Sequence, residues 1–194
     1  KQLLVRANQD ARKLRMVDKG NPNLQPLADI RSRLQQPSHN EMVLSRDPRL
    51  RVDVVRKEGG TTLTEAAVAR GLHWLIQHQA TDGSWSLSHF ARDGKCSCAN
   101  GGSSANRNVA TALALMPFLG AGQTHLTGYY REPVARGFRW LLAHQAENGD
   151  LRGDRSRVPG MYGHGQAALV LCEAYLMTGD DSLKEPAQKA VDFI

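Results

Sequence analysis

Residues 68–83 read VARGLHWLIQHQATDG, and 66 positions later residues 134–149 read VARGFRWLLAHQAENG. Ten of the sixteen positions are identical, which marks an internal repeat. A third copy begins at Glu185-Pro186, which matches Glu132-Pro133, and it stops within KAVDFI at residues 189–194. The repeat decides the fold, because each copy is one supersecondary unit whose apolar face must be buried against its neighbours.

Each copy contains two helical patterns of different character. The first is apolar on one side only, at Val68, Leu72, Leu75 and Ile76 and again at Val134, Phe138, Leu141 and Leu142. The second, over residues 109–119 and 167–177, is apolar almost all round and is typical of a buried helix. Half-exposed and buried helices in alternation predict two concentric rings, with outer helices over about 64–79 and 131–145 and inner helices over about 108–119 and 164–177.

The fold class predicted from this pattern is an all-α, α/α toroid, incomplete at about two and a half hairpins. We expect residues 1–60 to form a polar, basic lead-in or linker that is partly disordered, since its prolines forbid one long helix. The repeats occupy residues 61–194, and we expect the chain to be cut from a longer one at both ends. Thr62 and Glu65 are predicted to form a capping box where the repeats begin, and Pro117 to kink or shorten its helix.

The charge of +6 lies entirely in the lead-in. Its basic side chains alternate with acids and prolines and form no block, so a solvated linker and a binding arm both stay open. Residues 1–60 contain no aromatic side chain on which a base could stack, and no nucleic-acid partner is predicted. The sequence has no apolar run of about 18 residues, so no membrane span is predicted either.

Residues 70–85 resemble the QW repeat of squalene-hopene and oxidosqualene cyclases. The first copy matches that motif in full, and the second has Leu151 where a tryptophan is expected. The resemblance implies a structural motif in which the glutamine caps backbone groups near the tryptophan and ties adjacent repeats together. The matching residues are Arg70, Gly71, Trp74, Gln79, Gly83 and Trp85 in the first copy, and Arg136, Gly137, Trp140, Gln145 and Gly149 in the second.

Residues 110–124 and 163–180 also look like bacterial prenyltransferase or squalene-oxidase repeat proteins, so the resemblance covers about residues 61–194. A complete toroid of this terpenoid-cyclase-like type has more hairpins than the sequence contains. The cyclases of the family protonate their substrate with an Asp-x-Asp-Asp motif, which is absent here. Asp180-Asp181 follows Gly179 and is predicted to start a helix instead.

His164 and Tyr162 are the candidate binding residues, while no catalytic residue and no cofactor are predicted. A histidine near the start of a buried helix could ligate a metal, move a proton or bind a ligand, or it could simply hydrogen-bond to a loop. His78 and His144, beside the repeat glutamines, are predicted to be structural.

Two cysteines, Cys96 and Cys98, lie in the loop over residues 86–107, which we expect to lie near the loop over residues 148–163. With His89, His125 or His164 they are candidates for a zinc site, and free thiols are the expected alternative. Cys172 is predicted to be a small core residue.

Three functions remain open at this point. Protein prenyltransferases hold zinc through an Asp-x-Cys pair, and this sequence contains neither that pair nor the acid motif. Their absence favours a non-catalytic module that binds a hydrophobic molecule, a peptide or a protein. The first alternative is an isoprenoid-processing enzyme whose catalytic residues lie outside this sequence. The second is a toroid polysaccharide lyase, for which Arg152, Arg155 and Arg157 are the possible contacts to an acidic sugar.

Overall fold

A computed structural model describes residues 46–88, 98–99, 102, 106–153 and 160–194. Within these ranges the chain forms six α-helices and no strand, which confirms the predicted all-α class. The helices are α4 (Pro48–Lys57), α5 (Thr62–Gln77), α6 (Arg107–Gly120), α7 (Arg131–Ala143), α8 (Gly160–Thr178) and α9 (Asp181–Asp192). None of the helices in the described ranges is both long and apolar enough to cross a membrane.

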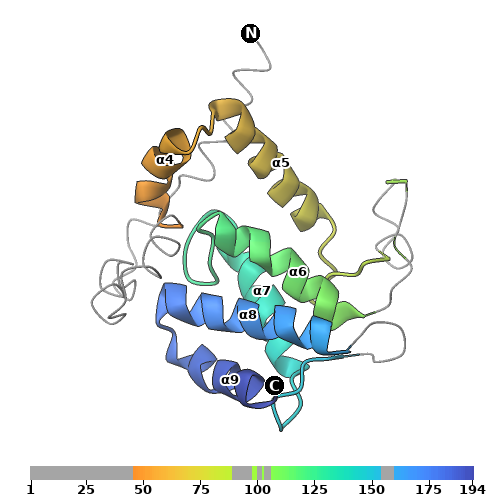
Figure 1. Ribbon diagram of the computed structural model, residues 1–194. Helices are drawn as coiled ribbons and strands as arrows, with labels where there is room; N and C mark the ends of the chain where they lie inside the picture. Colours follow the sequence, from red (N-terminus) through yellow and green to blue (C-terminus); the bar gives the residue numbers. More distant parts are fainter. Residues whose placement is uncertain (1–45, 89–97, 100–101, 103–105, 154–159) are drawn as a thin grey trace.

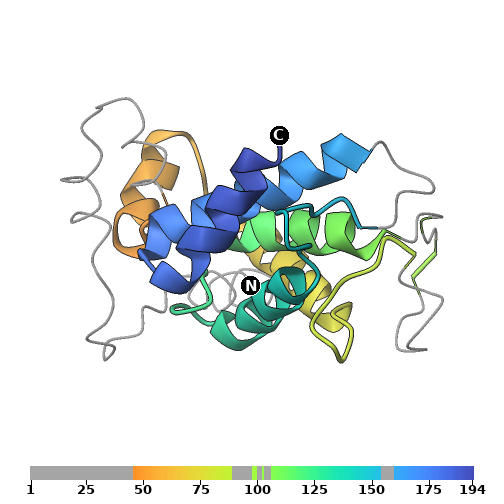
Figure 2. The same cartoon turned by 90° about the horizontal axis from the view of Figure 1, so that it is seen from below.

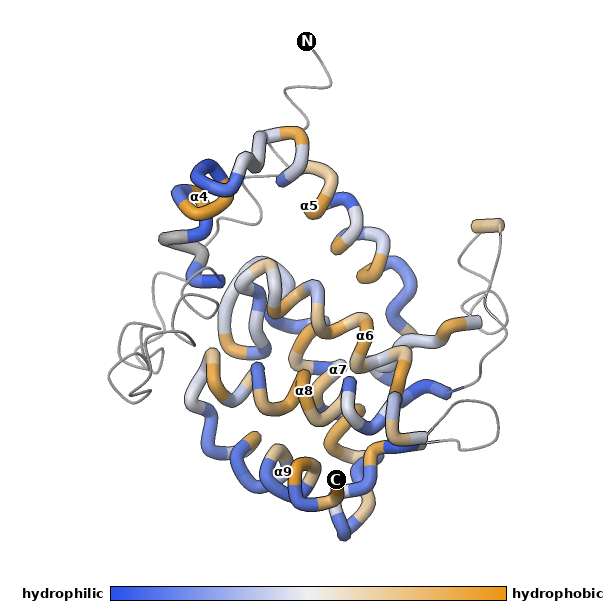
Figure 3. Tube along the Cα trace, in the orientation of Figure 1, coloured by the Kyte–Doolittle hydropathy of each residue, from blue (hydrophilic) through white to orange (hydrophobic). Residues whose placement is uncertain are grey.

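The inner helices α6 and α8 lie side by side and run in the same direction (Figure 1). The outer helix α7 packs on α6 and α9 packs on α8, while α5 touches α6 least (Figures 1 and 2). Apolar residues concentrate on α6 and α8, whereas α9 carries long hydrophilic stretches (Figure 3). The architecture is therefore an incomplete α/α toroid, with a core centred on Phe118, Leu115, Phe138, Leu141 and Leu171.

The helix boundaries differ from the sequence prediction in several details. Helix α5 covers Thr62–Gln77 instead of about 64–79, and α8 begins at Gly160 instead of about 164. The predicted Thr62–Glu65 capping box is wrong: the N-cap is Thr61, whose hydroxyl accepts the Thr64 N–H at 3.3 Å, while Thr64 Oγ1 accepts the Thr61 N–H at 2.8 Å. The Glu65 carboxylate does not cap the helix start, because it pairs with Arg51. Pro117 does not shorten α6, which continues to Gly120 with the Ala121 N–H bonded to the Pro117 carbonyl, and a kink at Pro117 stays a prediction.

Helix α4 lies within the predicted lead-in and is joined to the repeats by partly buried ionic contacts. The Arg51 guanidinium donates to both carboxylate oxygens of Glu65, at 2.9 and 3.2 Å, and to the Gly120 carbonyl at 3.0 Å. Arg46, just before α4, forms an ion pair with Glu173 on α8. Removing one partner of such a pair would leave a poorly solvated charge, so these contacts hold α4 against α5 and α8. The domain boundary at residue 60 stays a prediction.

A glutamine links each outer helix to the next one. The Gln79 amide donates to the carbonyls of Gly83 and Pro133, both at 2.8 Å, and its oxygen accepts from Arg136 at 2.6 Å. In the second copy, Gln145 donates to the carbonyl of Gly149 at 3.3 Å and to that of Pro186 at 2.9 Å. Each amide therefore ties the turn after one outer helix to the first turns of the following outer helix.

The glycine in each of these turns is required by conformation and by space. Gly83 and Gly149 have φ angles of +94° and +89°, which side chains rarely tolerate. A Cβ atom at Gly83 would lie 2.7 Å from the Arg136 carbonyl oxygen, and one at Gly149 only 2.0 Å from that of Lys189. The bare backbone of the glycine thus lets the turn approach the next helix closely enough for the glutamine to reach it.

The side chain two residues after Gly83 packs against the next outer helix, and the second copy has different residues at both equivalent positions. The Trp85 indole donates to the Leu75 carbonyl at 2.7 Å, and its ring fills the space beside Gly137, where a Cβ atom would lie 2.8 Å from Cζ3. In the second copy, fully buried Leu151 replaces Trp85 and Ala190 replaces Gly137. The large Trp85 thus stands opposite a glycine, and the equivalent positions of the second copy hold the smaller leucine and the larger alanine, as close packing requires.

His125 joins the connection between α6 and α7 to the start of α9. Its Nε2 lies 2.8 Å from Asp180 Oδ2, and its ring packs edge-on against Phe138. Asp180 is also the N-cap of α9 and accepts the Ser182 N–H at 2.9 Å. Burial raises the pKa of Asp180, but the hydrogen bonds from Ser182 and His125 lower it more, so the net pKa lies below the usual range.

We predict that Gly137→Ala is destabilising in the parent protein and less so, or not at all, in a Trp85→Leu background. Alanine gains about 1 kcal/mol of helix propensity over glycine, but overpacking against Trp85 costs about 1–3 kcal/mol. The clash with Trp85 is removed when leucine replaces tryptophan, as in the natural Leu151–Ala190 pair, while the contact with Leu115 Cδ2 at 2.9 Å remains. Urea denaturation of the four proteins measures the coupling. Equal costs of Gly137→Ala in both backgrounds would contradict this packing.

We also predict that the ionised Asp180 stabilises the fold in an acid-sensitive way. Because its folded pKa is depressed, this contribution is present above the unfolded pKa of about 3.9 and is lost as the pH falls through the folded pKa. The melting temperature of Asp180→Asn should therefore fall less between about pH 5 and pH 3 than that of the parent. Asp181→Asn, which alters an exposed neighbour, is the control and should behave like the parent; parallel curves for all three proteins would refute the prediction.

Candidate functional site

His164 is fully buried near the start of α8, and both of its ring nitrogens are hydrogen-bonded to the backbone. Nδ1 accepts the Leu151 N–H at 3.1 Å, and Nε2 lies 2.8 Å from the Ala190 carbonyl oxygen. An amide N–H can only donate and a carbonyl can only accept, so the ring is neutral with its proton on Nε2. In this arrangement His164 has no nitrogen left for a metal or for proton transfer.

The same position in the first repeat explains why a histidine stands here. Thr111 of α6 accepts the Trp85 N–H through its hydroxyl at 3.1 Å, as His164 accepts the Leu151 N–H. The second copy lacks the indole N–H of Trp85, and the His164 ring instead reaches across to α9. His164 is thus the second repeat's connection between its inner helix, its turn and the next outer helix.

Tyr162, the other candidate binding residue, lies on a different side of α8. Its side chain is 58% exposed, and Met161 and Leu169 on the same helix are 46% and 50% exposed. Residues two positions apart on a helix point in roughly opposite directions, so the helix separates Tyr162 from buried His164. The two candidates therefore do not form one site, and only Tyr162 is accessible to a ligand.

The described cysteine of the long loop contacts a different histidine from those considered for zinc. Cys98 Sγ lies 3.6 Å from Nε2 of His78, at the end of α5. His125 is bonded to Asp180, while Cys96 and His89 lie outside the described residues. Among the described residues, no group of three or more histidine, cysteine, aspartate and glutamate side chains is placed to hold a metal ion.

The two loops that precede the inner helices meet where they are described. Asn106, the N-cap of α6, donates to the Arg152 carbonyl at 2.8 Å. The Arg152 guanidinium itself is bonded to both Asp150 carboxylate oxygens and lies over the Phe193 ring. The side chain proposed for an acidic sugar is thus already paired, and Arg155 and Arg157 lie outside the described residues.

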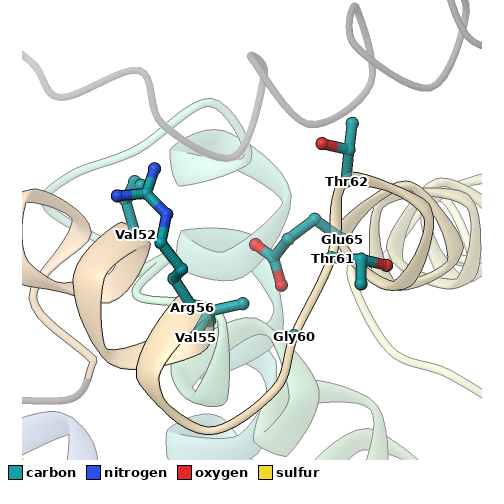
Figure 4. A pocket seen from close by; sticks show the side chains of 7 residues that line it. All are labelled: Val52, Val55, Arg56, Gly60, Thr61, Thr62 and Glu65. Carbon is teal, nitrogen blue, oxygen red and sulfur yellow. The ribbon is translucent and has the colours of Figure 1, made fainter.

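A cavity of about 310 Å³ opens between α4 and α5, on the outer side of the repeats (Figure 4). Figure 4 shows the Glu65 and Arg56 side chains at its wall. Glu65 is held by Arg51, and Arg56 is largely exposed beside Asp53. The lining residues of the cavity are Val52, Val55, Arg56, Gly60, Thr61, Thr62 and Glu65.

Sequence reasoning missed the contacts that depend on distant segments meeting. The pairing of Cys98 with His78 could have been suspected only from the extra length of the first loop. Trp85 and its bonding partner Thr111 are 26 residues apart, whereas the equivalent Leu151 and His164 are 13 apart. The structural use of His164 had a signal as well, because leucine replaces tryptophan at position 151.

The comparisons with known proteins agree with the repeat architecture. The family model of the squalene-hopene cyclase C-terminal domain matches residues 53–165, which span the second half of α4, all of α5, α6 and α7, and the start of α8. No curated protein and no solved structure matches the chain. The family match covers more than half of the 194 residues and includes both repeat glutamines, as the QW-like motifs predict. The chain belongs to the squalene-hopene cyclase C-terminal domain family.

Proposed function

We propose that this chain is a non-catalytic binding or scaffold module of helical repeats, whose α8 receives one further apolar α-helix of the kind that α8 itself supplies to α6. The binding surface is the α8 stripe, defined as Tyr162, Gly165, Leu169 and Cys172. These residues are spaced alternately by three and four positions, which places them along one side of a helix.

The observation that carries this proposal is the match between the α8 stripe and a covered stripe on α6. Thr111 and His164 have the same role, and aligning them pairs the α8 stripe with Val109, Ala112, Met116 and Leu119. These α6 residues are buried, apart from half-buried Met116. Val109 packs directly against α8, since a Cβ atom at Gly163 would lie 2.4 Å from Val109 Cγ2.

The α8 stripe therefore has the positions that receive a helix in the preceding repeat, but it is exposed or half-buried. Gly165, at its centre, has no atom within 4 Å of the place where a Cβ would stand, so the backbone of another helix has room to approach. Exposed apolar stripes of this kind favour helix-in-groove recognition, in which side chains at i, i+3 and i+7 make the contacts.

The titratable groups near the inner helices support binding over catalysis. His164 uses both ring nitrogens on the backbone, Glu173 is paired with Arg46, and Asp180 caps α9. The sequence has no Asp-x-Asp-Asp with which to protonate an alkene or epoxide. An isoprenoid-processing function would need catalytic residues from outside these 194 residues.

A labelled synthetic peptide of residues 160–178 tests the proposal, because α8 itself packs against α6 and contacts Val109 of the equivalent stripe. We expect saturable binding by fluorescence anisotropy and at least a tenfold weaker affinity for Leu169→Glu, since burying an unpaired carboxylate costs more than about 1.4 kcal/mol. Leu63→Glu is the matched control, because Leu63 is 56% exposed on α5, away from the α8 stripe, and this variant should bind like the parent.

Equal binding by the parent, Leu169→Glu and Leu63→Glu would contradict the proposal, as would the absence of saturable binding. Farnesol provides a second probe in the same assay. Saturable farnesol binding that Leu169→Glu abolishes, with no peptide binding, would favour the isoprenoid-processing alternative over a helix-binding module.

A further inference from the structure

The first repeat holds a thiol against an imidazole, a combination that the binding function does not use. Cys98 is half-buried, and its Sγ lies 3.6 Å from His78 Nε2, within hydrogen-bonding distance for sulfur. Cysteine becomes a nucleophile when its thiolate forms, and an adjacent histidine is a common base for that step.

The hydrogen bonds of His78 direct its basic nitrogen towards the thiol. Nδ1 lies 2.6 Å from the Trp74 carbonyl oxygen, which can only accept, so Nδ1 carries the proton of the neutral ring. The lone pair is then on Nε2, the atom that contacts Cys98. The ring also stacks on the Trp74 indole with a centroid distance of 3.9 Å, which holds its orientation.

The equivalent histidine of the second repeat has the same ring orientation. His144 Nδ1 lies 2.7 Å from the Trp140 carbonyl oxygen, and its ring stacks on Trp140 at 3.8 Å. The loop that follows His144 contains no cysteine, and it is the shorter of the two loops. The imidazole orientation is therefore common to both repeats, and only the longer loop of the first repeat places a thiol, Cys98, beside it.

We propose that Cys98 is a nucleophilic thiol with His78 as its base, and that it is a site of covalent modification by soft electrophiles. The Cys98 proton moves to His78 Nε2, and the thiolate attacks an electrophilic carbon. A sulfur–carbon bond forms as the leaving group departs with its electron pair, and the imidazolium then returns its extra proton to water. The imidazolium is stabilised meanwhile by the Trp74 carbonyl and by the face of the indole ring.

Cys172 provides a reference thiol within the same molecule. It lies half-buried on the inner helix α8, and burial raises the pKa of its thiol. Less of this thiol ionises near neutral pH, so an electrophile should discriminate between the two cysteines.

Alkylation by iodoacetamide tests the proposal in a Cys96→Ser protein, which retains Cys98 and Cys172 as its two thiols. Peptide mass spectrometry gives the rate at each cysteine between about pH 6 and pH 9. We expect Cys98 to react at least about tenfold faster than Cys172 near pH 6.5, and His78→Gln to slow Cys98 by about tenfold there. The difference in Cys98 rate between the parent and His78→Gln should disappear near pH 9, where the thiol ionises without a base.

His144→Gln is the matched control, because it removes the equivalent stacking and carbonyl contacts in the second repeat. It should leave the Cys98 rate and its pH profile unchanged. The proposal would be overturned if His78→Gln left the profile of the parent intact, or if His144→Gln slowed Cys98 equally. Cys98 and Cys172 should react alike in guanidinium chloride; a persistent difference in unfolded protein would also overturn the assignment.

Discussion

A side-chain amide with two N–H groups holds each junction between repeats. Gln79 bonds its own turn at Gly83 and the next outer helix at Pro133, and Gln145 does the same at Gly149 and Pro186. An amide has two donors, and both are used in each case. The remaining features follow from this link, because the turn must approach the next helix closely and only glycine tolerates both the positive φ and the short distance.

The link also determines how the inner helices begin. The backbone N–H of the residue two positions after the glycine donates to a side chain of the inner helix, to Thr111 in one repeat and to His164 in the other. The second repeat has lost its tryptophan, and the His164 ring makes a contact to α9 that a threonine is too short to make. Both ring nitrogens of His164 are therefore occupied by backbone groups of the turn and of α9.

The repeat register could be predicted from the sequence because the same local interactions recur in each copy. Helix positions, the inner and outer character of each helix and the family all followed from the spacing of apolar residues and from the glycine and glutamine positions. The N-cap was assigned one residue too late, because two adjacent threonines offer the same hydroxyl and long-range pairing with Arg51 removed Glu65 from the local choice.

The candidate sites could be predicted much less well, since they depend on contacts between distant segments. The sequence shows a histidine at position 164, but not that a turn and another helix bind its two nitrogens. Likewise, the path of a long loop decides that Cys98 meets His78, and no local pattern encodes that meeting. The pairing of Arg46 with Glu173 is equally distant in sequence, which explains why the attachment of α4 was not foreseen.

Hydrogen exchange in Gln79→Glu and Gln145→Glu tests the central role of the amide links most directly. Glutamate keeps the size of the side chain, but its carboxylate cannot donate and would face two carbonyl oxygens. We expect Gln79→Glu to speed exchange in α5 and α7, which this amide joins, and to leave α9 protected as in the parent. Gln145→Glu should instead speed exchange in α7 and α9. Unchanged exchange in the joined helices, or the same pattern in both variants, would contradict that role of the links.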